Sequence, residues 1–312
     1  MIRDKKFLEE IKQAVGSIAG EDYRIELVDM QKNNNTVYTG MTVKGRGENI
    51  SPTLQLEEFY QAFLDGVPVW EIAKNIFDWV RRDHNTRPDI PTDFYHFEKF
   101  REKIIFRLVN TEKNRELLKK VPSVPVYENL SLVFVIILQN DEDGVKTVRI
   151  SNQLMRTWNV EADELYRIAL ENTPRLLPAS FDNIAQVLRR MQMCSAKDSG
   201  EVMDGIEDKT SEEPPMYVLS NHERINGAAA IAYPGLLDKI ADRLDTNLII
   251  LPSSIHEVII MPETMESDFH VLNAMVREIN QTELKEEEIL SDTAYYYDRA
   301  KRIVTVPVSE VA

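Results

Sequence analysis

Cysteine and long apolar runs are both scarce in this sequence. Cys194 is the single cysteine among 312 residues, so no disulfide can form within the chain, which is typical of a reducing compartment. The longest purely apolar run, residues 132–138, is far shorter than the roughly 20 residues that span a bilayer. The N-terminus mixes charges from its start and has no apolar signal-peptide core. We therefore expect a cytoplasmic protein without a membrane partner.

Motifs that hold a metal, a cofactor or a catalytic nucleophile are also lacking. The five histidines show no His-Glu-x-x-His spacing, and Gly45-Arg46-Gly47 has no Lys-Ser/Thr after it to cradle a phosphate. The sequence has no Gly-x-Ser-x-Gly nucleophile elbow. We expect no metal and no cofactor, and the sequence alone assigns no catalytic residue. The absence of all three kinds of motif favours a protein that is not an enzyme.

The net charge of −15 comes mainly from two segments rather than from the whole chain. Residues 195–215 contribute −5 and residues 263–292 contribute −7, so the remaining chain is nearly neutral at −3. A net negative charge argues against nucleic acid as the main partner, because phosphate groups are also negative. The argument is weaker here, since the charge is concentrated in two segments. Residues 195–215 contain few apolar side chains and the pair Pro214-Pro215, which predicts a flexible acidic linker.

The strand-like segments occur mostly in pairs that suit hairpins, and helical segments separate these pairs along the chain. Apolar residues at helical spacing predict helices, and runs rich in valine, isoleucine, threonine and tyrosine predict strands. The predicted helices cover residues 7–18, 56–64, 69–80, 112–120, 161–172, 181–193, 226–244 and 269–280. The predicted strands cover residues 23–30, 36–44, 103–109, 130–138, 145–150, 216–220, 248–251, 257–261, 293–297 and 302–306. This order predicts an α+β fold with mainly antiparallel sheets and packed helices.

The chain is expected to form two regions. The two prolines in Val121-Pro-Ser-Val-Pro125 make this segment a stiff connector, and we place the domain boundary at its start. The prediction is an N-terminal α+β region over residues 1–121 and a C-terminal α+β region over residues 122–312. The C-terminal region includes the acidic linker 195–215.

A polar turn between two strongly apolar strands is the first candidate site. It contains Ser253, Ser254, His256 and Glu257. In a catalytic interpretation, Ser254 is the nucleophile, His256 its base and Glu257 the residue that orients the base. Strand geometry opposes this, because neighbouring side chains point to opposite faces and Ser254 and His256 lie about 6.5–7 Å apart at Cα. A tight turn capped by serine hydroxyls is the favoured interpretation.

The second candidate lies at the end of the strand predicted over residues 216–220. Asn221 and Asn226 stand at a carboxyl strand end, where ligands often bind. The alternative, which we favour, is that Asn226 caps a helix whose small residues 227–230 pack closely on the sheet. Pro234 is expected to kink or restart that helix, because proline has no amide donor.

Two other features have a functional and a structural interpretation. Residues 81–107 are locally basic with aromatic residues interleaved, as a nucleic-acid surface would be, but interspersed acids favour a solvated face with salt bridges. Tyr295, Tyr296 and Tyr297 lie on a predicted strand, so two of them share one face. They form either an aromatic contact patch or, more commonly, part of the core.

Several phrases of the sequence resemble, as a set, an uncharacterised family from anaerobic gut bacteria that is catalogued only as a domain of unknown function. The phrases are residues 50–60, 108–114, 121–123, 217–221, 226–229 and 250–258, and the last, Ile250-Leu-Pro-Ser-Ser-Ile-His-Glu-Val258, is the most specific. Residues 163–172 are also similar to a second uncharacterised bacterial family. The resemblance spans nearly the whole chain and implies one extended architecture and a bacterial cytoplasm. It transfers no catalytic residue.

We therefore expect a non-catalytic binding or adaptor protein whose partner is another protein. The candidate binding residues are those of the polar turn, with Asn221 and Asn226. A hydrolase-like enzyme that uses the turn Ser253–Glu257 is the alternative.

Overall fold

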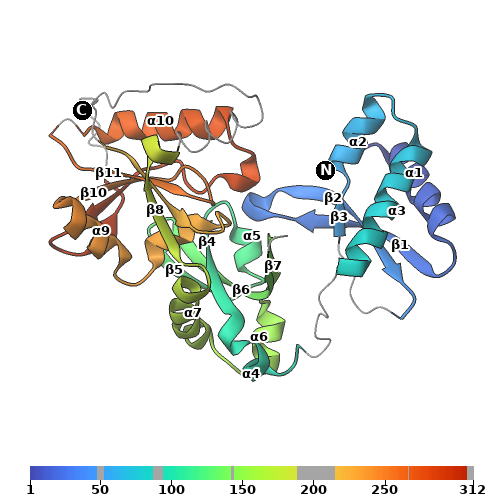
Figure 1. Cartoon of the computed structure of the whole chain (residues 1–312), viewed down its shortest axis with the longest axis horizontal. Coiled ribbons are helices and arrows are strands. Elements are labelled where there is room, and N and C mark those ends of the chain that lie inside the picture. The colour runs from blue at the N-terminus through green and yellow to red at the C-terminus, as the bar shows by residue number, and fades with distance from the viewer. Residues whose placement is uncertain (48–52, 87–93, 142–143, 188–214, 266, 308–312) are drawn as a thin grey trace. The chain divides into compact units, whose positions relative to one another are not determined.

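The computed structural model describes residues 1–47, 53–86, 94–141, 144–187, 215–265 and 267–307 (Figure 1). Contacts within the chain divide it into two units, Met1–Phe94 and Tyr95–Ala312. The division differs from the one expected at residues 121–122, because β4 (Ile104–Asn110) pairs along its whole length with β6 (Leu130–Asp141). Apart from Pro215, the segment expected as an acidic linker lies outside the described residues.

The first unit packs helices against a three-stranded antiparallel sheet. Phe7, Ile11 and Val15 recur at helical spacing, and all three are buried in the core of this unit, as the sequence predicts. Gly20 ends the helix that carries them with a positive φ of 79°. The elements are α1 (Lys5–Ala19), β1 (Tyr23–Gln31), β2 (Val37–Gly45), β3 (Thr53–Gln55), α2 (Glu57–Leu64) and α3 (Val69–Thr86), with a 3-10 turn at Asn33–Asn35.

The second unit begins with a four-stranded antiparallel sheet. Its central strand is β6, which pairs with β4 on one edge and with β5 (Ser123–Tyr127) and β7 (Gly144–Arg149) on the other. The segment expected as a proline-stiffened connector is therefore an edge strand, where a proline costs no ladder hydrogen bond. The helical elements beside this sheet are α4 (Phe97–Phe100), a 3-10 turn at Arg101–Lys103, α5 (Arg115–Leu118), α6 (Asn152–Trp158) and α7 (Ala162–Leu176).

A six-stranded antiparallel sheet follows, in the order β13-β12-β10-β11-β9-β8. Ile249 and Leu251 face α10 on one side of this sheet, whereas Tyr297 on the other side bonds to Asp238 of α9, so helices cover both faces (Figure 1). The elements are β8 (Ala179–Asn183), β9 (Tyr217–Asn221), a 3-10 helix (Gly227–Ala232), α9 (Leu236–Leu244), β10 (Leu248–Leu251), β11 (Val258–Pro262), α10 (Phe269–Thr282), a 3-10 turn (Glu286–Glu288), β12 (Tyr295–Asp298) and β13 (Ile303–Thr305).

The predicted α+β class with mainly antiparallel sheets is confirmed, but two of the predicted helices are wrong in part. Residues 179–183 form β8 rather than the start of a helix, because Phe181 pairs in register with Leu219 of β9. The Ser180 hydroxyl donates to the carbonyl of Asn221, its neighbour on β9. The helix predicted over 226–244 is a 3-10 helix and α9, separated by a break that contains Pro234. Of the three tyrosines, Tyr295 and Tyr297 are buried in the core.

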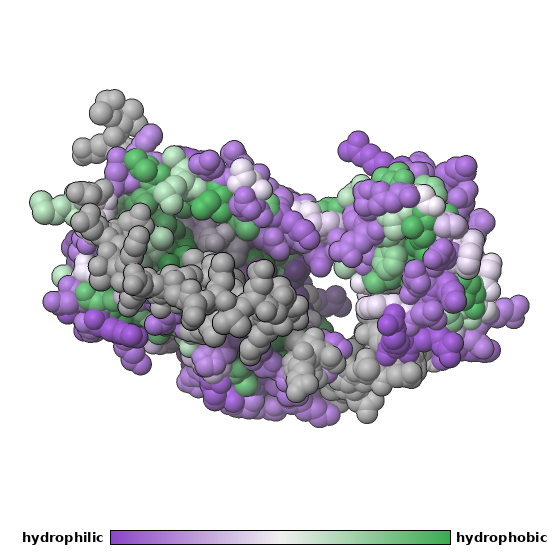
Figure 2. Space-filling view, turned by 45° about the horizontal axis from the view of Figure 1, so that its top comes forward, coloured by the Kyte–Doolittle hydropathy of each residue, from purple (hydrophilic) through white to green (hydrophobic). Residues whose placement is uncertain are grey.

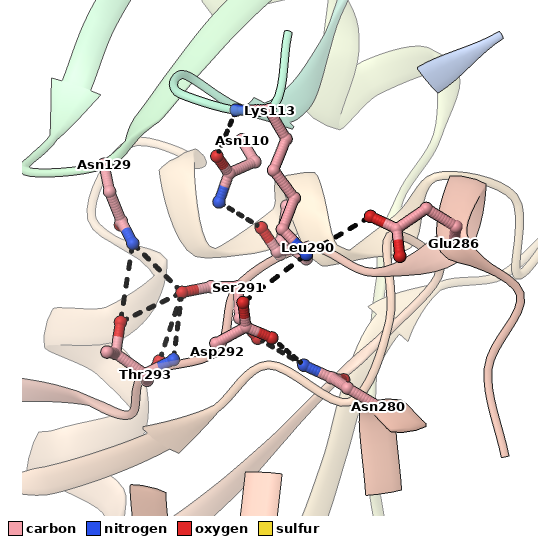
Figure 3. Close-up of polar contacts among 9 residues, drawn as sticks. All are labelled: Asn110, Lys113, Asn129, Asn280, Glu286, Leu290, Ser291, Asp292 and Thr293. Atoms are coloured by element: carbon pink, nitrogen blue, oxygen red, sulfur yellow. Dashed lines mark hydrogen bonds and ion pairs between the residues drawn. The ribbon is translucent and has the colours of Figure 1, made fainter. Parts of the chain in front are cut away.

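A buried polar cluster joins the two sheets of the second unit (Figure 3). Asn110, at the end of β4, donates from Nδ2 to the carbonyl oxygen of Leu290 at 3.1 Å and accepts from the Lys113 amide at 2.9 Å. Asn129 donates from Nδ2 to the hydroxyls of Ser291, at 3.1 Å, and Thr293, at 3.4 Å. These bonds connect the four-stranded sheet to the segment that leads into β12.

Charged and amide groups complete this cluster from the other side. Lys113 lies 3.4 Å from both a carboxylate oxygen of Glu286 and one of Asp292. Asn280 of α10 donates to the carbonyl oxygen of Ser291 at 2.9 Å and to Asp292 at 2.8 Å (Figure 3). Because buried polar groups are stable only when they are paired, this cluster fixes the two sheets and α10 in one arrangement.

Candidate functional site

The polar turn between β10 and β11 is held by its own hydrogen bonds. The hydroxyl of Ser254 accepts from the backbone N–H of His256 at 3.0 Å, and the Ser254 amide donates to the carbonyl of Glu257 at 3.1 Å. The next amide, that of Ile255, donates to the carbonyl of Glu288 at 2.8 Å. Ser254 is buried. This is the turn capped by a serine hydroxyl that the sequence favours.

The loop that follows β9 packs directly on this turn. The Ser220 hydroxyl donates to the carbonyl oxygen of His256 at 2.7 Å, and the Ala228 amide donates to the carbonyl of Ile255 at 3.2 Å. The Asn226 amide donates to Nδ1 of the His256 ring at 3.3 Å. Because Nδ1 accepts this bond, the proton of the neutral imidazole belongs on Nε2. The two candidate segments therefore form one structural feature.

The loop after β9 contains unusual backbone conformations. Arg224 and Asn226 both have φ near 52°, in the left-handed region that costs a non-glycine residue energy. Asn221 closes the loop, since its side chain donates to the Ile225 carbonyl at 2.9 Å and accepts from the Ile225 amide at 3.2 Å. At Gly227 an added Cβ would lie 2.1 Å from the Ser220 hydroxyl oxygen, so only glycine fits there. Strain of this kind is concentrated at functional sites in proteins.

A catalytic triad is not assembled at the turn. In the described part of the chain, no hydrogen bond joins the Ser254 hydroxyl to the His256 ring, because the hydroxyl accepts a backbone N–H and ring Nδ1 accepts another. The Glu257 residue lines a groove, and no hydrogen bond joins its carboxylate to the His256 ring within the described residues. These bonds correspond to the structural interpretation of Ser254 and His256.

An apolar groove of about 370 Å³ lies beside the turn, between α10 and the strands β9, β10 and β11. Ser253, Glu257 and Arg224 line it and provide its polar groups. Its apolar lining includes Val187, Val218, Leu251, Ile259, Val276 and Ile279. Two of the six candidate residues therefore belong to a groove that the sequence did not predict.

The helix beside the groove exposes apolar side chains. Leu272 and Val276 are the buried face of α10, whereas Val271, Met275 and Ile279 are 54%, 44% and 40% exposed. Figure 2 shows hydrophobic residues interrupting the polar surface over this helix. The three exposed residues recur every four positions, which places them in one row along the helix. This spacing was visible in the sequence and could have identified the row.

A small cavity lies on the other side of the loop. Its volume is about 10 Å³, and its lining includes Asn221 and Asn226 together with Arg107 of β4 and Thr147 of β7. Arg107 is half-buried and donates from Nη2 to the Thr147 hydroxyl at 2.5 Å. Burial, with the neighbouring positive charge of Arg149, lowers the pKa of Arg107 to about 10. Sequence reasoning missed Arg107, because it assigned the basic stretch 81–107 to a solvated face.

The six candidate residues therefore lie in one continuous feature. Ser253 and Glu257 line the groove, Asn221 and Asn226 line the cavity, and His256 is hydrogen-bonded to both Ser254 and Asn226. The model of a family of unknown function, DUF5688, matches residues 4–299, which include both units and all six of these residues. The chain belongs to this family. No curated protein and no solved structure matches the chain.

Neither a metal-binding cluster nor a membrane-spanning helix occurs within the described residues. Within the described residues of this family member, no group of three or more His, Cys, Asp or Glu side chains is placed to hold a metal ion. Over the same part of the chain, none of the helices combines the length and the apolar character needed to cross a bilayer.

Proposed function

We propose that the protein is a non-catalytic binding protein whose groove receives an amphipathic helix of a partner protein. One observation carries this proposal: the apolar groove between α10 and the six-stranded sheet continues into the exposed row Val271, Met275 and Ile279. Contiguous apolar surface of this kind on a folded protein marks an interaction site.

The shape and spacing of the surface favour a helix as the occupant. A helix bound in a groove uses apolar side chains at helical spacing, and the row on α10 has the complementary spacing of every fourth residue. Val218, Leu251 and Ile259 provide an apolar floor on the strands. We expect the partner's apolar face to bury Met275 and Ile279, and affinity to depend on these contacts.

Charged side chains at one end of the groove indicate which charges the partner helix should carry there. Arg224 and Glu257 both line the groove, and neither forms an ion pair with another described residue. A partner helix with an acidic residue near Arg224 and a basic residue near Glu257 would satisfy both. Opposite charges at one end favour one direction of entry, because a reversed helix would carry its complementary charges to the other end of the groove, away from Arg224 and Glu257.

The hydrolase alternative has less support. The Ser254 hydroxyl and the His256 ring are each bonded to backbone groups of the turn and loop. A base must lie within hydrogen-bond reach of the nucleophile's proton. A cytoplasmic location fits a chain with a single cysteine, and it remains part of this proposal together with a bacterial source.

Site-specific photo-crosslinking tests the proposal. A photo-reactive amino acid is placed at Met275 and, in a matched control, at Ile303, which is 45% exposed on β13 of the same unit. We expect the Met275 position to crosslink one defined segment of a partner, and that segment is then made as a synthetic peptide. Crosslinks equal at both positions, or crosslinks between two copies of this chain, would contradict the proposal.

The peptide then tests the groove directly. Met275→Glu places a charge in the apolar groove, and we expect peptide affinity to fall by about tenfold or more, since about 1.4 kcal/mol of apolar contact is lost. Ala274→Glu adds the same charge on the same helix at an exposed position that does not line the groove, and it should bind the peptide normally. Equal loss in both variants would show that charge alone, rather than the groove, controls binding.

A further inference from the structure

Arg107 is a half-buried cation with no neutralising partner in the described part of the chain. Its contact there is one hydrogen bond from Nη2 to the hydroxyl of Thr147, at 2.5 Å. No carboxylate of the described residues forms an ion pair with it. A charge removed from water is costly unless it is paired, so the position calls for a negative group.

A second arginine lies on the same face of the four-stranded sheet. Arg107 is in register with Val133 of β6, and Arg149 of β7 is in register with Val135. Residues two apart on a strand point to the same face, so the two arginines flank β6 on one face of the sheet. Arg149 is exposed to solvent, and its positive charge adds to burial, which is the larger cause, in lowering the pKa of Arg107. Neither cation forms an ion pair with a carboxylate of the described residues.

The opposite wall of the cavity offers further hydrogen-bond donors. Asn226, whose backbone is left-handed, lines the cavity, and its side-chain amide makes no hydrogen bond to a described group. Asn221 uses one N–H of its amide on the Ile225 carbonyl and has a second N–H available. The Thr147 hydroxyl accepts from Arg107, so its own hydrogen is free to donate. Residues that line the cavity on both sides therefore have donors left for a ligand.

We propose that Arg107, Arg149, Thr147 and Asn226 bind the carboxylate or phosphate group of a small anionic ligand. The cavity of about 10 Å³ has room for about one oxygen atom, comparable to one water molecule. One anionic oxygen therefore occupies the cavity between Arg107 and the loop. The rest of the group lies outside the cavity, where Arg149 is exposed. Guanidinium groups suit both anions, because their N–H groups match the geometry of carboxylate and phosphate oxygens.

This anion site is independent of the proposed groove. The groove is lined by Arg224, Ser253 and Glu257 and the helix α10, none of which lines the cavity. Loss of the anion site therefore leaves the partner-binding proposal intact, and the reverse also holds. The two proposals use different probes and different variants.

Calorimetric titration of the whole protein tests the anion site with two probes, sodium phosphate and sodium acetate, at constant ionic strength. We expect one probe to bind saturably with a Kd below about 10 mM, which corresponds to a binding free energy of at least about 2.7 kcal/mol. Tighter binding of phosphate would assign a phosphate ligand, and tighter binding of acetate would assign a carboxylate ligand. No saturable binding of either probe would overturn the proposal.

Variants identify the site. Arg107→Met and Asn226→Asp should each weaken binding of the better probe by about tenfold or more, because one removes a charged donor and the other adds a repelling charge. Arg115→Met removes an exposed arginine on α5 and should bind the probe as the wild type does. Circular dichroism shows whether each variant is folded. Binding that is unchanged in folded Arg107→Met would also overturn the proposal.

Discussion

Arg107→Met should leave the second unit as stable as the wild type or make it more stable, although it removes a half-buried residue. Burial and Arg149 lower the pKa of Arg107 from its ordinary value to about 10, so keeping this guanidinium charged in the folded protein costs about 3 kcal/mol. Methionine removes that cost and fills apolar space with a flexible side chain. It also removes the hydrogen bond to Thr147, worth about 1.5–3 kcal/mol for a charged donor. The net expected change is a gain of about 0–1.5 kcal/mol in the free energy of unfolding.

Hydrogen exchange of the backbone amides of β6 measures this free energy for the second unit alone. Arg115→Met is the control, because an exposed ion pair with Glu112 contributes about 0–1 kcal/mol. Because the pKa of Arg107 is lowered to about 10, the cost of its charge is fully present below pH 10 and disappears as the pH rises above 10 toward the ordinary pKa of an arginine. A loss of more than about 1 kcal/mol in Arg107→Met would refute the reasoning, since it would show that the cation stabilises the fold without a ligand.

Three further predictions concern stability. Gly227→Ala should lower the free energy of unfolding by about 3 kcal/mol or more, because its Cβ would lie 2.5 Å from the His256 carbonyl oxygen. Gly16→Ala in α1 should instead raise it by about 0.5–1 kcal/mol. Urea denaturation checks both, and equal effects would contradict the packing described. Asn110→Ala should lower the free energy of unfolding by about 2–4 kcal/mol, because it leaves the buried Leu290 carbonyl without its hydrogen-bond partner. Hydrogen exchange of the β4 amides checks this. A loss below about 1 kcal/mol would be inconsistent with a paired buried network. Burial raises the pKa of Tyr295 to about 12, so between pH 10 and 12 the folded protein holds a proton that the unfolded chain releases, and stability falls as pH rises. Ultraviolet absorbance should show the buried tyrosines ionising together with unfolding, and gradual ionisation in a still-folded protein would contradict the prediction.

The fold was most predictable where apolar periodicity and burial agree. Phe7, Ile11 and Val15 define one face of α1, and the run Leu248–Leu251 is a strand buried on both faces. Both patterns are local, so they can be read without knowing which element packs on which. The hairpin of β6 and β7 was predictable for the same reason.

Residues 179–183 were not predictable in this way, because their structure depends on a distant partner. Ile184 and Val187 have helical spacing, which extended the predicted helix backward over Phe181. In the folded chain Phe181 pairs with Leu219 and stacks on the Tyr217 ring at 4.7 Å between centroids. Strand pairing between distant segments overrides local helix propensity.

The candidate site was predictable in its parts but not in its assembly. The serine-capped turn followed from the residue types of Ser254 and its neighbours. The contact of Asn226 with His256 joins residues far apart in the sequence, and no local pattern indicates it. Arg107 was hidden by its neighbours, because a basic stretch with interspersed acids is typical of a solvated surface. Its alternation with Phe106 and Leu108 on a strand was the available signal of a half-buried position.

Hydrogen exchange of the protein with and without the crosslinked partner peptide tests the central claim most directly. If the groove receives the partner's helix, added protection should be confined to α10 and to the segments 216–218, 251–253 and 257–259, which contribute lining residues of the groove. Protection of β13 or of the first unit, with α10 unchanged, would contradict the account.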